Sequence, residues 1–306
     1  MSEIIFKENF IERYSKLTNF KEFKNSCLTP LRRSIRVNTL KISVNDLKQK
    51  LESNFILQKI PWCNEGFFIE HKTGRRDIGN TLEHSLGYYY VQEAASMIPP
   101  LLLNSQKEDL ILDMCASPGS KTTQIASLME NQGLIIANDY KGIRLRPLGI
   151  NLQKSGITNT IITLMRGQWF KNFQFDKILL DAPCSGTGAI RKSLKTLLIY
   201  NTKMITKLAK EQKQLILTAF PALKPKGTLI YSTCSLEPEE NEEVIDFLLK
   251  KYDNVSIEKI NLNIKRSEPI LNFNNKNYSE EIKNTLRLWP QDNDTEGFFV
   301  AKIKKL

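Results

Sequence analysis

The sequence predicts an α/β protein in which a small α+β domain precedes a larger domain with a parallel sheet. From about residue 109 onward, short apolar runs alternate with helical segments. This alternation is typical of parallel strands with helices on both faces of the sheet. Before residue 105 the order is strand, helix, strand, strand, so we expect domains at residues 1–105 and 106–306.

The elements of the first domain are predicted from residue spacing and from one helix cap. Apolar residues lie among charged ones over residues 1–26, which favours a helix. Ser43 and Asp46 resemble a capping box, which predicts that a helix begins at Val44. In order, we expect a helix within 1–26, a strand at 33–39, a helix at 44–51, and strands around 55–60 and 66–70.

The second domain is expected to begin with a strand at 110–114, because a Pro/Gly loop and a helical stretch follow this short apolar run. Further strands are expected at 133–139, 160–165, 175–183 and 227–233, and helices at 121–131, up to about 154, at 202–223 and at about 239–251. In parallel sheets, ligands bind at the carboxyl ends of the strands. The loops after these strands are therefore where we expect the functional site.

The composition is that of an ordinary soluble protein. Of 306 residues, 41% are apolar and 25% charged, which excludes extensive disorder and a coiled-coil or collagen-like rod. The longest apolar stretch, residues 88–103, contains Glu93 and two prolines, so we expect no membrane span. The N-terminus has no pattern of a secretory signal, and we expect a cytoplasmic protein.

The formal net charge is +11, and such a balance favours a polyanionic partner. The excess is concentrated between residues 190 and 226, where Glu211 is the only acid among nine basic residues. A charge run by itself is most often a solvated helix face. This one follows a candidate catalytic loop, so we expect it to contact phosphates.

Five cysteines lie at positions 27, 63, 115, 184 and 234. No two of them have the spacing of zinc ligands, and the chain has only two histidines. We therefore expect reduced thiols, no disulfide framework and no metal site. Cys27 and Cys63 have no motif around them and are expected to be small buried residues.

The loop after the first strand of the second domain reads DMCASPGSK, from Asp113 to Lys121. A glycine loop between a strand and a helix allows backbone N–H groups to approach a ligand closely. The glycine spacing fits neither a P-loop nor the dinucleotide fingerprint. Asp139 ends the next strand, where an acid can accept hydrogen bonds from both hydroxyls of a ribose, or can cap a helix. Together these features favour a nucleoside ligand without phosphates, such as S-adenosylmethionine.

Two cysteine motifs follow later strands, DAPCSG at 181–186 and YSTCSL at 231–236. Asp181 could bond the edge of a base, and a cysteine could be a nucleophile or a proton carrier. A single cysteine of this kind is more often a core residue, but two at neighbouring strand ends, both followed by serine, favour catalysis. The six acids between Glu237 and Asp246 are expected to favour a helix N-terminus and to do no chemistry.

These motifs resemble those of the RNA (cytosine-5) methyltransferases of the Nop/Sun family. The resemblance covers nearly the whole chain, and the double-cysteine pattern is highly specific. It implies a Rossmann-like S-adenosylmethionine-dependent methyltransferase sheet and a small RRM-like domain that binds RNA. The compact form is most similar to archaeal tRNA methyltransferases. The segments that carry the resemblance are IRVNTL (35–40), LGYYYVQEAASM (86–97), DMCASPGSKT (113–122), NDY (138–140), DAPCSGTGAIRK (181–192), YSTCSLEPEENEEVI (231–245) and RLWPQDNDTEGFFVAKIKK (287–305).

The chemistry implied by this resemblance gives both thiols a role. Carbon 5 of cytosine is a poor nucleophile, and addition of a thiolate to carbon 6 creates an enamine that can attack a sulfonium methyl group. The family implies that Cys234 is the nucleophile and that Cys184 assists release of the product, although chemistry alone would allow either order. It also implies that Asp181 and Lys121 line the pocket, with a protonated or proton-sharing Asp181 donating to ring nitrogen 3. The helix start after Cys234 and nearby Lys121 are the candidates for stabilising the thiolate.

The resemblance also assigns cofactor-binding residues. They are the loop Cys115, Ala116, Ser117, Pro118, Gly119, Ser120 and Lys121, then Asp139 for the ribose, with Arg144 and Asp181 nearby. One position departs from the family, which usually has Asp-Gly after 160–165, its acid contacting the adenine amine. This chain has Arg166–Gly167, and arginine has no acceptor. Either a backbone carbonyl takes over, or the affinity for the cofactor is weaker.

The expected function is methyl transfer to carbon 5 of cytosine in RNA, with tRNA as the first choice of target. The alternatives are a ribosomal RNA target, or a catalytically weak RNA-binding or assembly factor, which only Arg166 favours. DNA is disfavoured, because DNA enzymes would carry the nucleophile in the Pro-Cys motif and would not need Cys234. The target base must leave its stack, and Tyr88, Tyr89 and Tyr90 either support splayed RNA or pack in the core. We expect a monomer with no metal and no membrane contact.

Overall fold

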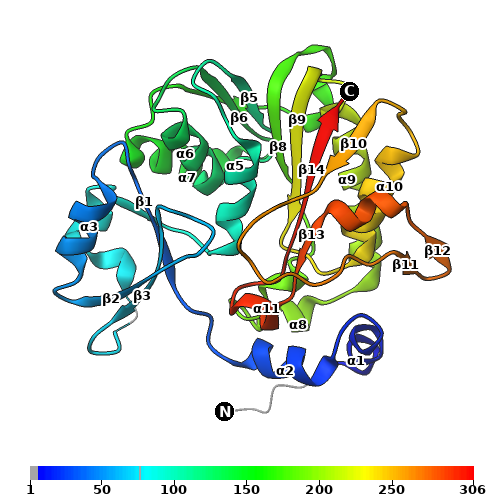
Figure 1. Ribbon diagram of the computed structural model, residues 1–306, viewed down its shortest axis with the longest axis horizontal. Helices are drawn as coiled ribbons and strands as arrows, with labels where there is room; N and C mark the ends of the chain where they lie inside the picture. The colour runs from blue at the N-terminus through cyan, green and yellow to red at the C-terminus, as the bar shows by residue number, and fades with distance from the viewer. Residues whose placement is uncertain (1–5, 76) are drawn as a thin grey trace.

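A four-stranded sheet and an eight-stranded sheet organise the chain, of which the computed structural model describes residues 6–75 and 77–306 (Figure 1). The smaller sheet belongs to the N-terminal part of the chain and the larger sheet to the rest. A hairpin of two short strands, β11 (Asn272–Phe273) and β12 (Lys276–Asn277), lies outside both. The mixed α/β architecture with its large parallel sheet confirms the predicted fold class.

The small sheet is antiparallel, with the strand order β2-β3-β1-β4. It consists of β1 (Ser34–Val37), β2 (Phe55–Lys59), β3 (Gly66–His71) and β4 (Tyr89–Val91), with α3 (Val44–Leu51) packed against it and the short α4 (Leu82–Ser85) before β4. The helix begins at Val44 as predicted, because the backbone N–H of Asp46 donates to Ser43 Oγ at 3.1 Å. The sequence did not predict β4. This strand buries Tyr89, so core packing is the correct interpretation for that tyrosine.

The helical segment expected within residues 1–26 is two helices, α1 (Glu8–Ser15) and α2 (Phe20–Leu28). Asn19 caps α2, because its side chain accepts from the backbone N–H of Glu22. An aromatic stack of Phe10, Tyr14 and Phe23 packs both helices against Trp289. Residues 1–5, where the predicted helical segment starts, lie outside the described residues.

The large sheet has the order β10-β14-β9-β8-β5-β6-β7, and β13 pairs with β14. Its strands are β5 (Leu110–Asp113), β6 (Leu134–Asp139), β7 (Thr160–Leu164), β8 (Phe175–Asp181), β9 (Leu223–Thr233), β10 (Val255–Glu258), β13 (Leu286–Leu288) and β14 (Phe298–Lys305). The five strands from β7 to β9 are parallel, and β14 runs antiparallel beside β9. Asp113, Asp139, Asp181 and Thr233 are the last residues of four neighbouring strands, so the four candidate loops leave the sheet at one edge.

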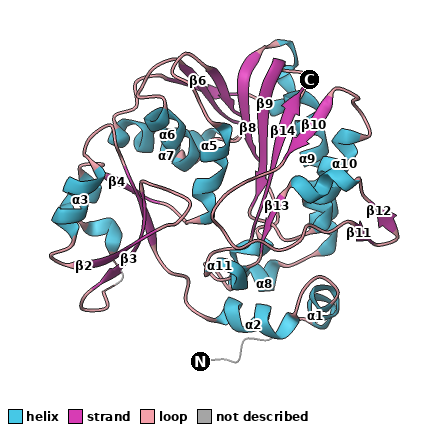
Figure 2. Cartoon of the chain, viewed as in Figure 1, coloured by secondary structure: helices cyan, strands magenta, loops and turns pink. Residues whose placement is uncertain are grey.

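Helices cover both faces of this sheet (Figures 1 and 2). They are α5 (Ile98–Leu103), α6 (Ser120–Leu128), α7 (Gly142–Ser155), α9 (Thr202–Ala219) and α10 (Glu242–Leu249). The short helices α8 (Lys195–Ile199) and α11 (Pro290–Asn293) lie instead beside α2. Figure 1 shows α5, α6 and α7 between the two sheets, with α9 and α10 on the far side of the large sheet. Within the described residues, no helix is both long and apolar enough to cross a membrane.

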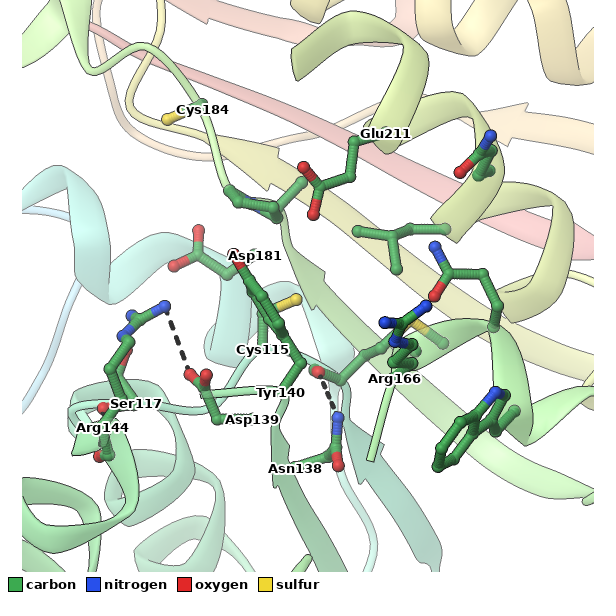
Figure 3. Close-up of a pocket in the computed structure, with 18 of the residues that line it drawn as sticks. Cys115, Ser117, Asn138, Asp139, Tyr140, Arg144, Arg166, Asp181, Cys184 and Glu211 are labelled. Atoms are coloured by element: carbon green, nitrogen blue, oxygen red, sulfur yellow. Dashed lines mark hydrogen bonds and ion pairs between the residues drawn. The ribbon is translucent and has the colours of Figure 1, made fainter. Parts of the chain in front are cut away.

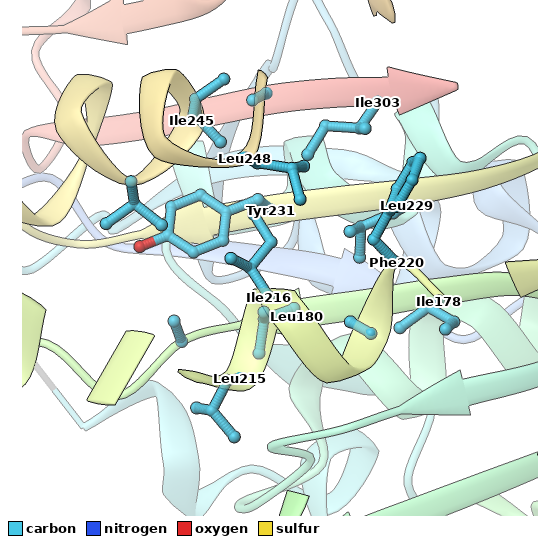
Figure 4. Close-up of a cluster of buried hydrophobic side chains, with 14 of the residues drawn as sticks. Ile178, Leu180, Leu215, Ile216, Phe220, Leu229, Tyr231, Ile245, Leu248 and Ile303 are labelled. Atoms are coloured by element: carbon cyan, nitrogen blue, oxygen red, sulfur yellow. The ribbon is translucent and has the colours of Figure 1, made fainter. Parts of the chain in front are cut away.

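The core follows the alternation of side chains along the strands. Ile178, Leu180 and Tyr231 point to the face covered by α9 and α10, where they meet Phe220 and Ile245 (Figure 4). The intervening residues Leu179 and Ile230 point to the opposite face and pack with Ile98 and Ile125 of α5 and α6. Because successive side chains of a strand face opposite sides, both faces of β8 and β9 are buried. The catalytic loops are therefore anchored on rigid strands.

Candidate active site

A cavity of about 910 Å³ opens at the carboxyl ends of the parallel strands (Figure 3). It reaches from the ends of β5 and β6 to the loops that carry Cys184 and Cys234, and α9 forms one wall. The lining residues are Met114, Cys115, Ser117, Asn138, Asp139, Tyr140, Arg144, Arg166, Gly167, Gln168, Trp169, Asp181, Ala182, Pro183, Cys184, Lys207, Lys210, Glu211, Gln214, Leu215 and Cys234.

Asp139 is buried at one end of this cavity and has an unused acceptor. Its Oδ1 accepts from the backbone N–H of Lys141 at 3.1 Å. Its Oδ2 lies 3.3 Å from Arg144 Nη1 (Figure 3) but receives no hydrogen bond from the described residues. A buried oxygen without a partner is costly, and the hydroxyls of a ribose would satisfy it. This orphaned oxygen fits a nucleoside cofactor.

The glycine loop supports the cavity from the end of β5. Ser117 is held by two contacts with Arg144: its Oγ donates to the Arg144 carbonyl at 2.7 Å, and Arg144 Nη2 donates to the Ser117 carbonyl at 2.6 Å. Gly119 has φ +102°, a backbone conformation that favours glycine. Of the predicted loop residues, Cys115 and Ser117 line the cavity, whereas Ala116, Pro118, Gly119, Ser120 and Lys121 are not among its lining residues; Lys121 reaches the site only through its ion pair with Asp181.

Asp181 and Lys121 form an ion pair at the middle of the site. Lys121 Nζ donates to Asp181 Oδ2 at 2.6 Å, and Ser232 Oγ donates to Asp181 Oδ1 at 2.8 Å. Burial would lower the pKa of Lys121, but the charge and hydrogen bond of Asp181 outweigh it and raise that pKa. Both oxygens of Asp181 are acceptors in this arrangement, so the proton nearest to the carboxylate is carried by Lys121.

The two candidate catalytic cysteines lie side by side, with Cys184 Sγ 3.3 Å from Cys234 Sγ. They come from loops after β8 and β9, fifty residues apart in the chain. The hydrogen bond with Cys234, together with burial, raises the pKa of Cys184 well above its ordinary value. Cys184 is therefore held as a neutral thiol next to the other sulfur. Cys115 is a third free cysteine at the cavity, and burial raises its pKa as well.

The acids after Cys234 do more than favour a helix start. Glu237, Glu240 and Glu242 are fully buried, and α10 begins only at Glu242. Glu237 accepts from Arg13 Nε at 2.7 Å and from Tyr14, and Glu242 pairs with buried Arg287 at 2.6 Å. The predicted helix N-terminus accounts for Glu242, which lies in the first turn of α10, but it does not account for the burial of these acids. Their partners come from distant parts of the chain, which local charge patterning does not reveal.

Several lining residues were not predicted to belong to the site. Asn138, at the end of β6, joins both neighbouring strand ends, because its amide donates to the carbonyls of Met114 after β5 and Met165 after β7. Trp169 is exposed and lines the cavity beside Arg166, which has no ion-pair partner among the described residues. Glu211, the single acid of the basic window, also lines it. Asn138 belongs to the NDY segment that carries the resemblance but had no predicted role, and nothing in the local pattern distinguishes Trp169 or Glu211 from ordinary surface side chains.

The basic window divides into two groups. Arg191 is buried and bonds Asp294 and the Thr295 carbonyl, while Lys213 pairs with Glu243 and Lys224 with Asp176. These three residues stabilise the fold. Lys207 and Lys210 instead lie on the exposed side of α9 and line the cavity.

The fold and site define a class of protein. A parallel sheet with an acid at the end of its second strand, an orphaned carboxylate oxygen and no P-loop is typical of S-adenosylmethionine-dependent methyltransferases. The family model for the 16S rRNA methyltransferase RsmB/F matches residues 100–304, and the model for the N-terminal domain of RsmF matches residues 6–94. The chain belongs to this family, and its methyl donor is S-adenosylmethionine.

Individual relatives agree with this assignment. A tRNA (cytosine(49)-C(5))-methyltransferase of Pyrococcus abyssi is 46% identical over 98% of this chain and 99% of its own length. A ribosomal RNA small subunit methyltransferase F of Vibrio campbellii is 41% identical over 99% of the chain, which spans 64% of that protein.

Two solved structures are also similar to the chain. A methyltransferase homolog of Pyrococcus horikoshii superposes with a TM-score of 0.88 at 38% identity, covering 99% of this chain and 96% of its own. NSun6 from Pyrococcus horikoshii with SFG superposes with a TM-score of 0.84 at 25% identity, covering 98% of both chains.

Proposed function

We propose that this methyltransferase modifies carbon 5 of cytosine in tRNA through a covalent adduct between Cys234 and carbon 6 of the base. The observation that carries the proposal is the pair of thiols 3.3 Å apart, next to the Asp181–Lys121 ion pair. A single nucleophile would need one cysteine. Two at the same point suit a reaction in which one thiol adds and must later be expelled.

The described side chains suit the steps of this reaction. Cys234 adds as a thiolate to carbon 6, and the Lys121–Asp181 pair shares its proton with ring nitrogen 3 as negative charge develops there. When bound, the cofactor supplies the electrophilic methyl group. After transfer, water takes the proton from carbon 5, the electrons of that C–H bond restore the double bond between carbons 5 and 6, and Cys234 leaves carbon 6 as a thiolate. Cys184, held as a neutral thiol beside Cys234, assists that release.

The cofactor-binding part of the proposal comprises the loop from Cys115 to Lys121, Asp139 and Arg144. Asp139 Oδ2 takes the ribose hydroxyls, and Arg144 fixes both Asp139 and Ser117. The region 1–105 serves as the RNA-binding module and 106–306 as the catalytic domain. The protein acts as a monomer in the cytoplasm.

The choice of tRNA is supported by the Pyrococcus abyssi relative, which matches over nearly its whole length. Ribosomal RNA is the second candidate, because the Vibrio relatives are almost as similar. The cavity would accept a single cytosine from either RNA, so its side chains do not favour tRNA over ribosomal RNA.

The test is to incubate the protein with S-adenosylmethionine and unmodified tRNA or ribosomal RNA, followed by nucleoside mass spectrometry. We expect 5-methylcytidine from the wild type with tRNA, no product from Cys234→Ala, and a covalent protein–RNA adduct with Cys184→Ala. If 5-methylcytidine formed only with ribosomal RNA, ribosomal RNA would take the place of tRNA as the proposed substrate. If Cys234→Ala formed 5-methylcytidine, the assignment of Cys234 as the nucleophile would be wrong.

A catalytically weak assembly factor remains the alternative that Arg166 favours. Calorimetric titration with S-adenosylhomocysteine separates it from the enzyme. An affinity in the micromolar range or tighter supports the enzyme, and undetectable binding together with no product supports the assembly factor.

A further inference from the structure

Glu240 is a buried carboxylate without a cationic partner in the part of the chain that the structure describes. It is fully buried, in the short 3₁₀ turn before α10. Its charge is balanced only by hydrogen bonds, which come from Ser185, Ser235 and Gln212. A buried charge of this kind is expensive to desolvate. A carboxylate kept in such a place calls for an explanation beyond packing.

The donors to Glu240 are the residues that directly follow the two cysteines. Ser185 follows Cys184 and donates both its backbone N–H, at 3.0 Å, and its hydroxyl. Ser235 follows Cys234, and its hydroxyl donates to the same oxygen, Oε2. The two hydroxyl oxygens are 3.2 Å apart. One carboxylate thus holds both cysteine loops, because each serine that donates to it is the residue directly after a catalytic cysteine.

The carboxylate is itself fixed from other sides. Gln212 of α9 donates to Glu240 Oε1 at 3.0 Å and to the Pro183 carbonyl at 2.9 Å. Tyr231 donates its hydroxyl to the backbone carbonyl of Glu240. The loops cannot separate without breaking this network, in which every donor is buried in the core of the site.

We propose that Glu240 is a positioning residue that sets the separation of the two thiols, so that Cys184 reaches the carbon 6 adduct as soon as methyl transfer is complete. The proposal rests on the proposed function. It assigns each serine to one half of the reaction: Ser235 orients Cys234 for attack, and Ser185 orients Cys184 for release. Misplacing a reacting group by a fraction of its contact distance can cost a factor of about 10² in rate.

The test uses Ser235→Ala, Ser185→Ala, Glu240→Gln and Glu240→Ala, with Cys184→Ala as the reference. Single-turnover methylation and the yield of covalent RNA adduct are measured per active site, titrated from the first turnover so that misfolded protein is not counted. Ser235→Ala should slow the first turnover about 10-fold without trapping adduct. Ser185→Ala should leave the first turnover unchanged and trap adduct, as Cys184→Ala does. Glu240→Ala should show both effects, and Glu240→Gln a weaker form of both.

Glu243→Ala is the matched control. Glu243 lies three residues away and pairs with Lys213 and Lys276, away from the cysteine loops. Its loss should lower stability slightly and leave both readouts unchanged.

Two results separate this inference from the proposed function. If Cys184→Ala traps adduct but Ser185→Ala and Glu240→Ala show wild-type rates and adduct yields per active site, Glu240 is purely structural and the inference fails. If Cys184→Ala traps no adduct, the proposed division of labour fails first. In this proposal Ser185 acts only through Glu240. The double variant Ser185→Ala with Glu240→Ala should therefore trap no more adduct than Glu240→Ala alone. A larger adduct yield in the double variant would contradict the shared network.

Discussion

Asp113 shows how burial at a strand end changes the charge of a single residue. It lies at the end of β5 beneath the glycine loop and is fully buried, with Thr122 Oγ1 donating to Oδ2 at 2.7 Å, while Oδ1 receives no hydrogen bond from the part of the chain that the structure describes. Burial raises the pKa of Asp113 to about 7. Between pH 4 and 7 the folded state therefore holds a proton that the unfolded chain releases, and stability falls as the pH rises through this window.

Asp113→Asn should remove that pH dependence. We expect the variant and the wild type to have similar free energies of unfolding near pH 4.5, and the variant to be more stable at pH 8 by on the order of 2 kcal/mol. Urea denaturation at both pH values measures the difference. An offset that stays constant with pH would show that Asp113 is not the titrating group.

Arg166 lines the cavity at the position where the family resemblance implies an acid, and its substitution tests which of two explanations holds. If the affinity for the cofactor is weaker because no acceptor meets the adenine amine, Arg166→Asp should lower the dissociation constant of S-adenosylhomocysteine about tenfold. That is the effect of one hydrogen bond to a charged group. If a backbone carbonyl already accepts from the amine, the dissociation constant should hardly change. Lys171→Asp controls for the change of net charge, because Lys171 is exposed and does not line the cavity.

At the scale of elements, helix α9 joins the core to the RNA side of the site. Its inner face carries Gln212 and Leu215, and its outer face carries Lys207 and Lys210 at the cavity. An unpaired lysine near RNA releases a counterion on binding, whereas one already bonded to an acid does not. The lysines of one helix are therefore expected to differ in their effect on RNA affinity.

The salt dependence of RNA binding measures that difference. Lys207→Gln with Lys210→Gln should reduce the slope of log K against log salt by about 1.4, using about 0.7 per contact for single strands. Lys213→Gln is the control, because Lys213 pairs with Glu243 at 2.8 Å. If the double variant and the control changed the slope equally, Lys207 and Lys210 of α9 would not be part of the RNA interface.

The elements that the sequence predicted well are those with a strong local signal. The helix from Val44 to Leu51 has a cap, and the strands β5, β6 and β8 are apolar runs of the right length. The break at Asn19 carried a similar signal that was missed, because Glu22 follows it at the spacing of an N-cap, whereas the three-residue β4 lacked one. The burial of the acids after Cys234 was missed because their partners, Arg13 and Arg287, are distant in sequence.

For the molecule as a whole, sheet topology explains why the site could be assembled from sequence. Two of its residues, Asp139 and Asp181, end strands, and two others, Cys184 and Cys234, lie in the loops that follow strands. A parallel sheet brings these strand ends together at one edge. Residues that reach the cavity from helix faces or from the 3₁₀ turn after β7, such as Glu211 and Trp169, depend on packing and were missed. The same holds for Glu240, whose role depends on two loops meeting.

The contact between the small sheet and α6 also depends on packing, and it lies next to the glycine loop. Arg36 of β1 is buried and donates to the Ser120 carbonyl at 2.8 Å and to Thr123 Oγ1 at 2.9 Å, both at the start of α6. It also bonds Gln92, which directly follows β4. No acid pairs with Arg36 among the described residues, so the neutral oxygen acceptors of Gln92, Ser120 and Thr123 are what meet its charge.

Arg36→Met should therefore weaken both stability and cofactor binding. It leaves Gln92 Oε1 without a donor among the described residues and removes the charged donor from the Ser120 carbonyl and Thr123 Oγ1, and we expect a loss of about 2–3 kcal/mol in the free energy of unfolding. Because the acceptors at Ser120 and Thr123 begin the helix after the glycine loop, the affinity for S-adenosylhomocysteine should fall several-fold in protein that remains folded. Arg33→Met, at an exposed position before the same strand, should change neither quantity. Lower stability with unchanged affinity would mean that the contact of Arg36 supports the fold without reaching the cofactor loop.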